Sequence, residues 1–277
     1  MKYEIKEDRI LIYGKDDFCA EHILSCGQIF SYFKKENRYV VLSSDKKATI
    51  EETDNGYTIL TKNPQYFENF FDLKTDYSKI KTNLSSFELL KVPISYGQGI
   101  RILKQDLFET LISFIVSANN NITRIKAILF RLREKFGTKI DDFYALPTRE
   151  QLLSVKESDF CEIGAGYRAK YLYQVVRMID DLTLLQWNDL STDKLKEKLL
   201  SLMGVGEKVA DCILLFGYSR MDVFPVDTWI EKVYQKYFDF EKNRSKIRQN
   251  LIKKFGNLSG YAQQYLFYAE REGVEFV

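Results

Sequence analysis

The spacing of apolar residues changes along the chain, from alternation in the first part to helical intervals in the second. Before about Lys62, short runs such as Tyr39 to Leu42 and Tyr57 to Leu60 alternate apolar and polar residues. Polar turns separate them, and one contains Asn55-Gly56, a pair that accepts the positive φ of a tight turn. This pattern predicts antiparallel hairpins.

Helices are expected from there on, first over residues 64–73 and 76–90. The stretch Val92 to Gly99 contains one proline and two glycines, so we place a domain boundary there. Beyond it, apolar residues recur every three or four positions, most clearly between Ile122 and Phe136. Further helices are expected over residues 106–117, 168–180, 193–202, 207–216, 228–237, 245–255 and 261–271.

These elements predict an α+β fold. Residues 1–98 are expected to form an antiparallel sheet domain with flanking helices, and residues 99–277 an all-helical region. The 277 residues are 45% hydrophobic and 14% aromatic, which is enough to build a sizeable core.

The net charge is only +2, so the overall balance does not by itself indicate a nucleic-acid partner. Two basic strings are candidates for phosphate contacts, although some of their members are expected to solvate exposed helix faces. They comprise Arg124, Lys126, Arg131, Arg133 and Lys135, and then Lys242, Arg244, Lys246 and Arg248.

The cysteines Cys19, Cys26, Cys161 and Cys212 lack Cys-x-x-Cys spacing, which argues against a zinc or iron–sulfur site and favours buried free thiols. The N-terminus does not resemble a signal peptide, and no apolar run is long enough to span a bilayer. We therefore expect a globular protein of a reducing, cytoplasmic compartment.

The most informative segment is LSLMGVGEKVADCILLFGY, in which one helix ends at Gly204-Val205-Gly206 and a second begins at once. Unpaired amides and the helix dipole at the second N-terminus suit a phosphate oxygen, and glycines allow a close approach. The alternative is an ordinary helix–helix turn capped by glycine.

Lys208 falls in the first turn of the second helix, where the dipole disfavours a cation. An uncharged amine there is able to attack the anomeric carbon of a nucleotide and hold the sugar as a Schiff base. The alternative is a solvated surface lysine. In the later segment Phe224-Pro225-Val226-Asp227-Thr228-Trp229, Asp227 is either a helix cap or a carboxylate that stabilises a cationic sugar, or both.

These motifs resemble the helix-hairpin-helix DNA glycosylase superfamily, whose pattern is a Gly-x-Gly hairpin, a lysine and a Pro-x-Asp. Gly204, Gly206, Lys208 and Asp227 match that pattern, and the lysine resembles that of bifunctional glycosylases with lyase activity. Further segments resemble the 8-oxoguanine DNA glycosylase branch. They are SCGQIF (25–30), SANNNITRI (117–125), GAGYRAKY (164–171), KVADC ending at Cys212, and GYAQQYLF (260–267).

The resemblance implies a pocket for an extruded base. The carbonyl of Gly27 would accept a hydrogen bond from the ring nitrogen that carries a proton only after oxidation. Phe267 and Cys212 would sandwich the base, and Gln263 would bond to its pairing edge. Taken alone, Gly27 suits a turn and Phe267 suits a helix core.

The resemblance also implies contacts around the opposite cytosine. Asn119, Arg124 and Arg168 would hold it, and Tyr167 would fill the emptied stack. The alternatives are helix capping by the asparagine run and solvated arginines. Trp229 departs from the family pattern, because eukaryotic relatives carry a histidine there that contacts the phosphate and active-site network.

The resemblance implies a compact bacterial-type member with a TATA-binding-protein-like sheet, acting as a monomer on duplex DNA that contains oxidised guanine. The strength of the preference for opposite cytosine is left open, since a compact member is able to have a relaxed one. No cofactor, metal ligand or membrane contact is expected. Two alternatives stay open: a glycosylase for another damaged or mismatched base, and a non-enzymatic hairpin protein that only binds DNA.

Overall fold

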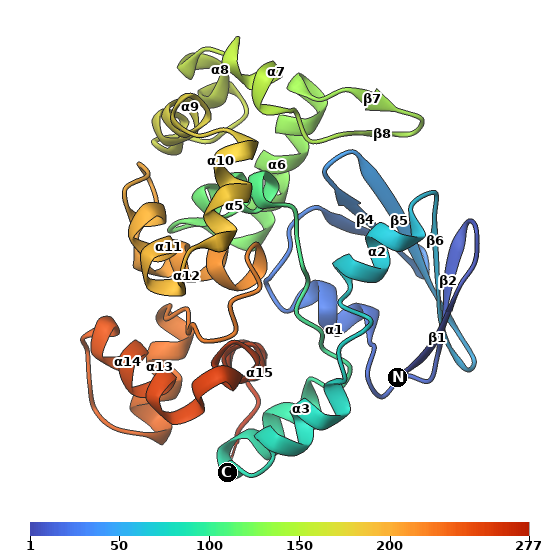
Figure 1. Cartoon of the computed structure of the whole chain (residues 1–277), viewed down its shortest axis with the longest axis vertical. Helices are drawn as coiled ribbons and strands as arrows, with labels where there is room; N and C mark the ends of the chain where they lie inside the picture. Colours follow the sequence, from blue (N-terminus) through green and yellow to red (C-terminus); the bar gives the residue numbers. More distant parts are fainter. Residues whose placement is uncertain (277) are drawn as a thin grey trace.

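A computed structural model describes residues 1–276. The N-terminal part is a six-stranded antiparallel sheet in the order β1-β2-β6-β5-β4-β3, and the helices stack beside it (Figure 1). The strands are β1 (Lys2–Ile5), β2 (Arg9–Tyr13), β3 (Tyr32–Lys35), β4 (Arg38–Ser43), β5 (Lys46–Thr53) and β6 (Gly56–Thr61). A separate two-stranded sheet joins β7 (Lys139–Ile140) and β8 (Phe143–Tyr144).

The alternating pattern sets the register of the sheet. The predicted turn at Asn55-Gly56 joins β5 to β6, with Thr53 opposite Gly56. Alternate residues such as Ile50 and Ile59 face each other and are buried. The helices α1 (Ala20–Ser25) and α2 (Pro64–Phe70) contribute side chains to the apolar core on this face.

Each predicted helical range overlaps an observed helix, and α12 and α13 begin and end at the predicted residues. The remaining helices are α3 (Tyr77–Leu84), α4 (Lys91–Tyr96), α5 (Leu107–Ser117), α6 (Ile122–Phe136), α7 (Arg149–Leu153), α8 (Glu157–Glu162), α9 (Arg168–Met178), α10 (Asp181–Gln186), α11 (Thr192–Leu200), α12 (Glu207–Phe216), α13 (Thr228–Tyr237), α14 (Arg244–Phe255) and α15 (Ser259–Arg271). Short 3-10 helices cover Glu88–Leu90, Trp187–Asp189 and Gly256–Leu258.

The sequence did not predict α1, α4, α7, α8, α10 or the β7–β8 hairpin, because these elements are too short to show a period. The stretch chosen as a boundary, residues 92–99, is largely the helix α4, whose Pro93 and Ile94 are buried. A proline in the first turn of a helix costs nothing, since its missing N–H has no partner there. No helix within residues 1–276 is long and apolar enough to cross a membrane.

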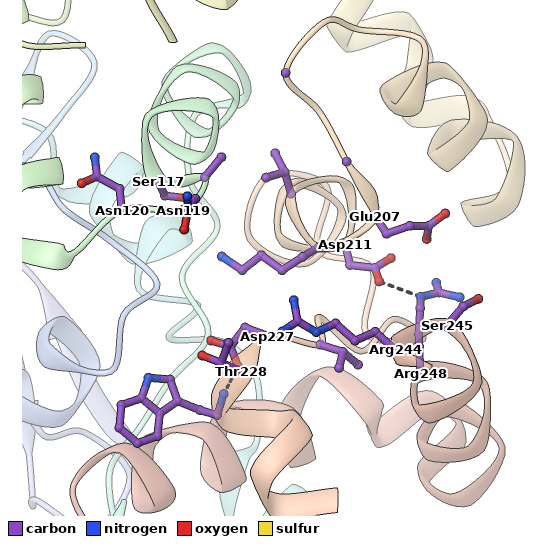
Figure 2. A pocket seen from close by; sticks show the side chains of 17 residues that line it. Ser117, Asn119, Asn120, Glu207, Asp211, Asp227, Thr228, Arg244, Ser245 and Arg248 are labelled. Atoms are coloured by element: carbon purple, nitrogen blue, oxygen red, sulfur yellow. Dashed lines mark hydrogen bonds and ion pairs between the residues drawn. The ribbon is translucent and has the colours of Figure 1, made fainter. Parts of the chain in front are cut away.

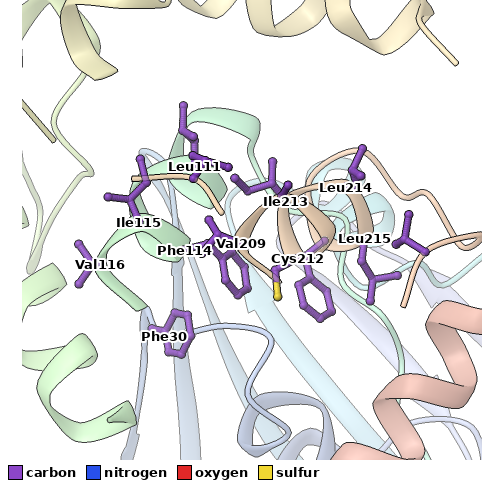
Figure 3. Close-up of a cluster of buried hydrophobic side chains, with 14 of the residues drawn as sticks. Phe30, Leu111, Phe114, Ile115, Val116, Val209, Cys212, Ile213, Leu214 and Leu215 are labelled. Carbon is purple, nitrogen blue, oxygen red and sulfur yellow. The ribbon is translucent and has the colours of Figure 1, made fainter. Parts of the chain in front are cut away.

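Two apolar cores hold the chain together. One lies against the sheet and includes Leu103, while the larger one joins the helices and also takes in Cys26, Phe30 and Leu84 from earlier in the chain. Figure 3 shows part of the larger core, where Phe30 lies close to residues of α5 and α12. The two cores therefore interleave along the sequence, and the division at residue 98 stays a prediction.

A buried ion pair ties the sheet to the helices. Glu109 of α5 bonds to Arg133 of α6, and their side chains are 6% and 1% exposed. The same carboxylate accepts hydrogen bonds from the Ser31 hydroxyl at 2.7 Å and the Ser44 amide at 2.6 Å. A buried charge of this kind is tolerable only while all its partners are present.

We predict that Glu109→Ala lowers the free energy of unfolding by about 3–5 kcal/mol, because it leaves the Arg133 guanidinium buried without its carboxylate. Urea unfolding followed by circular dichroism measures this. Glu51→Ala, which removes an exposed pair with Arg38, is the control and should change stability by less than about 1 kcal/mol. Equal effects of the two substitutions would contradict the prediction.

Candidate active site

The helical hairpin is built from α11, a short turn and α12. Gly204 has a φ of +86°, and a side chain there would meet the ring of Tyr171 at 2.7 Å. Gly206 is the residue before α12, has open space where a side chain would be, and leaves the first amides of the helix accessible. The turn therefore leaves open space beside the start of α12, and its binding of a phosphate stays a prediction.

Lys208 lies in the first turn of α12 and is half-buried. Its Nζ lies 5.4 Å from the ring centre of Phe114 in α5. Cys212 stands one turn further along α12 and is buried. Burial raises the pKa of the Cys212 thiol to about 11 and outweighs the nearby Lys208 charge, which acts to lower it. The thiol is therefore uncharged at neutral pH.

Asp227 caps α13, as the simpler interpretation of the sequence predicted. Its Oδ1 accepts hydrogen bonds from the backbone amides of Trp229 and Ile230, both at 3.0 Å. Because both bonds end on Oδ1, they fix the side chain at the helix start without occupying Oδ2. The capping role and a role toward a bound sugar are compatible.

A cavity of about 620 Å³ opens in front of these groups. Its walls come from the end of α5, the hairpin turn, and the starts of α12, α13 and α14. The predicted site residues among its lining are Asn119, Gly204, Gly206, Lys208 and Asp227. In Figure 2, Asn119 and Asn120 lie on one side of the cavity, and Ser245 and Arg248 lie on the other.

A second, smaller cavity of about 40 Å³ adjoins it, and Lys208 and Asp227 line both. All four residues predicted to read the base also line it, namely Gly27, Cys212, Gln263 and Phe267. Ligand pockets usually exceed roughly 300 Å³, so a base does not fit this cavity as it stands. Entry of a base requires neighbouring side chains to move.

Gly27 lies at a bend with a φ of +82°. Neighbouring carbonyl oxygens accept side-chain hydrogen bonds, Ser25 from Arg271 (2.6 Å), Cys26 from Gln264 (2.6 Å) and Gln28 from Gln105 (2.7 Å). Within residues 1–276, no hydrogen bond ends on the carbonyl of Gly27 itself. That carbonyl is therefore a free acceptor among the described residues, and it belongs to a residue that lines the small cavity.

Gln263 of α15 is 5% exposed, and its Oε1 has no hydrogen-bond partner among residues 1–276. An unsatisfied buried amide oxygen is costly to a folded protein and calls for an explanation. Because Gln263 lines the small cavity, binding of a ligand with N–H donors would explain the unpaired oxygen.

The residues predicted to hold the opposite base lie around the loop between α5 and α6. Asn119 is exposed and has a φ of +49°, and Asn121 caps α6, as the capping interpretation of the asparagine run predicted. Arg124 is exposed and its Nη2 donates to the Gly164 carbonyl at 3.3 Å. Tyr167 is 55% exposed, with its hydroxyl 3.2 Å from the Ala118 carbonyl.

Arg168 differs from these residues because it is only 2% exposed. Its Nε donates to the Ala118 carbonyl at 2.9 Å and its Nη2 to the Asn119 carbonyl at 2.8 Å. The guanidinium therefore holds the backbone that presents Asn119. It is not a solvated arginine, and its contact with a cytosine stays a prediction.

Sequence reasoning missed Asp211, which lines the large cavity and is 1% exposed. It pairs with Arg248 of α14 at 2.6 Å and with Lys196 of α11 at 3.1 Å. Burial raises its pKa, and both cations act against that shift. No local pattern indicates this pair, because Arg248 is distant along the chain and belongs to a basic string that also suits phosphate contacts or a solvated helix face.

Trp229, which departs from the family pattern, is half-buried and lines the large cavity. The Nζ of Lys232 lies 4.4 Å from its ring centre.

No group of three or more potential metal ligands from His, Cys, Asp and Glu occurs among the described residues.

We predict that Gly204→Ala lowers the free energy of unfolding by about 1–3 kcal/mol, because a side chain at that φ is strained and meets Tyr171. It should also weaken binding to duplex DNA. Gly206→Ala is the matched control, since nothing lies within 4 Å of its new methyl group, and it should retain stability. Thermal unfolding and fluorescence anisotropy measure the two effects, and a Gly204→Ala protein indistinguishable from Gly206→Ala would refute the geometry.

Comparison with known proteins agrees with this geometry. The family profile described as "8-oxoguanine DNA glycosylase, N-terminal domain" matches residues 10–111, and that of the "HhH-GPD superfamily base excision DNA repair protein" matches residues 112–257. The N-glycosylase/DNA lyase of Saccharomyces cerevisiae is 30% identical, over 95% of this chain and 86% of its own. A probable N-glycosylase/DNA lyase of Methanothermobacter thermautotrophicus is 31% identical, over 75% of each chain.

Among solved structures, the chain is similar to the 8-oxoguanine glycosylase/lyase of Clostridium acetobutylicum bound to double-stranded DNA with cytosine opposite 8-oxoguanine. The TM-score is 0.92 and the identity 38%, with coverage of 99% of this chain and 98% of that one. Shared sequence and shared fold thus extend over both parts of the molecule. The chain belongs to the HhH-GPD superfamily of base excision DNA repair proteins, in the branch of the 8-oxoguanine DNA glycosylases.

Proposed function

We propose that this protein excises 8-oxoguanine from duplex DNA and then cleaves the strand at the resulting abasic site. The observation that carries the proposal is that Lys208 and Asp227 line both cavities at once. The large cavity is able to receive the DNA backbone, and the small one contains the predicted base-reading groups. The nucleophile therefore stands where sugar and base would meet.

DNA binding begins at the hairpin in this proposal. The amides that follow Gly206 bind a phosphate oxygen, and their helix dipole favours the negative charge. Arg244, which is exposed, lines the same cavity and pairs with Glu231 at 2.8 Å, adds a cation. Tyr167, exposed at the rim, takes the place of the extruded nucleotide in the stack.

Base reading follows from the free groups of the small cavity. The carbonyl of Gly27 accepts a hydrogen bond from N7–H of 8-oxoguanine, whereas guanine has an acceptor at N7 that would repel it. The unpaired Oε1 of Gln263 accepts from the pairing edge of the base. Phe267 and Cys212 cover its two faces, for which an aromatic ring and a neutral thiol are suited.

The chemical steps require an uncharged amine at Lys208. Its Nζ forms a bond to C1′ as the bond from C1′ to N9 of the base breaks, and the base leaves after gaining a proton. The carboxylate of Asp227 stabilises the positive charge that develops on the sugar. Opening of the sugar ring gives a Schiff base with Lys208, and loss of the C2′ proton then expels the 3′ phosphate by β-elimination.

The two alternatives explain the site less well. A hairpin that only binds DNA needs neither a lysine and a carboxylate at the same cavity nor an unpaired buried glutamine behind them. A glycosylase for another base would use the same amine, but not a free carbonyl directed at a protonated purine nitrogen. We further propose that the protein acts in the cytoplasm on nucleoid DNA, where its substrate is found.

We predict that Lys208→Gln abolishes the covalent adduct that borohydride traps with 8-oxoguanine DNA, because an amide cannot form a Schiff base. Denaturing gel electrophoresis measures the adduct, and binding of the uncleaved duplex should persist. Lys232→Gln, which changes a lysine beside the same cavity, is the control and should still give the adduct. Trapping by Lys208→Gln would remove Lys208 from the mechanism.

We predict that cytosine is the preferred opposite base and that Arg124→Ala lowers this preference, since Arg124 is an exposed donor beside the loop of Asn119. The ratio of excision rates opposite cytosine and adenine should fall about five- to tenfold, the effect of losing one base contact. Single-turnover assays on duplexes that differ only in the opposite base measure it. Lys135→Ala, an exposed cation of the same helix, should leave the ratio unchanged.

A further inference from the structure

Arg271, the last residue of α15, lies behind the small cavity and has no role in the mechanism described above. Its Nη2 donates to the Ser25 carbonyl at 2.6 Å, two residues before Gly27. Its Nη1 lies 3.3 Å from the position that a Cβ of Gly27 would occupy. One side chain thus contacts the segment that presents the free carbonyl.

The same guanidinium also contacts Phe267, one helical turn earlier on α15. Its Cζ lies 5.5 Å from the ring centre of Phe267, and that ring lies 3.0 Å from the Cβ position of Gly27. Arg271, Phe267 and Gly27 therefore form a closed set of contacts. Two members of this set are the groups predicted to read and to cover the base.

The surroundings of Arg271 show that it is not an ordinary surface arginine. Its side chain is only 14% exposed, and among residues 1–276 its one carboxylate partner is Glu272, at 2.7 Å and itself 38% exposed. Its Nη1 is buried without an acceptor among residues 1–276. A guanidinium kept partly unsatisfied in this place is costly, which argues for a function.

We infer that Arg271 is a positioning residue for lesion recognition, which fixes the segment from Ser25 to Gly27 against Phe267 so that the Gly27 carbonyl meets the oxidised base. The inference rests on the proposed function. Discrimination between guanine and its oxidised form depends on a single carbonyl, so a small displacement of this segment is enough to weaken it. The lyase step on an abasic site involves no base and does not depend on that carbonyl.

This difference gives the test. Arg271→Met keeps an apolar contact with Phe267 and removes the donors to Ser25. We expect its single-turnover rate of 8-oxoguanine excision to fall about ten- to a hundredfold, while cleavage of a preformed abasic site stays within about twofold of the parent protein. Arg271→Lys, which restores one donor but not the planar pair of contacts, should recover part of the excision rate.

Glu272→Gln is the matched control, because it removes the negative charge beside Arg271 and leaves the bond to Ser25. Both of its activities should stay within about twofold of the parent. Unchanged excision by Arg271→Met, or an equal fall in excision and abasic-site cleavage, would overturn the inference. The parent protein is assayed first, and failure of that protein to excise 8-oxoguanine would instead overturn the proposed function.

Discussion

The site depends on one set of contacts, by which the loop between α1 and β3 is held against the helical region. The Gln28 side chain, fully buried, donates to the Ile23 and Arg101 carbonyls and accepts from the Leu103 amide at 2.8 Å. Gln264 of α15 then donates to the Cys26 carbonyl at 2.6 Å. Gly27, whose carbonyl is proposed to read the base, lies between these anchored residues. Lys208 and Asp227 lie in the helical region instead. The relative position of the loop and the helical region is fixed by buried amides whose loss leaves unsatisfied groups.

The two side chains that we propose to react both lie at the start of a helix, with opposite electrostatic consequences. Asp227 precedes α13 and Lys208 is in the first turn of α12, so both meet the positive end of a helix dipole. That field and two amides favour the carboxylate, which doubles as a cap. The same field acts against a cation at Lys208, whereas the ring of Phe114, 5.4 Å from its Nζ, attracts one. The carboxylate is therefore stabilised where it caps the helix, and the amine stands at the same cavities, where attack on a sugar carbon requires its uncharged form.

The sequence predicted what depends on neighbours along the chain. The bounds of α12 and α13, the Gly204–Gly206 turn and the Asp227 cap follow from local turn and capping chemistry. It did not predict the pairing of Asp211 with Arg248, the burial of Arg168 or the contact of Arg271 with Ser25. Each of these depends on partners far apart in sequence, which no periodic pattern encodes. The base-reading set was predictable only through resemblance, since glycine, glutamine and phenylalanine at those positions also suit a turn and a helix core.

The closed small cavity constrains how a lesion enters. At about 40 Å³ it has room for little more than water, so the Phe267 ring and its neighbours must yield before a base is accommodated. The interactions that a base gains on entry offset the cost of that rearrangement. Two groups able to make them have no partner among residues 1–276, namely the Gly27 carbonyl and the buried Oε1 of Gln263. Guanine satisfies the second but repels the first, so it gains less free energy with which to open the pocket. In the proposed mechanism, discrimination therefore comes from the opening of the pocket as much as from the final contacts. The amine of Lys208 would then meet C1′ only of a nucleotide whose base has entered the pocket.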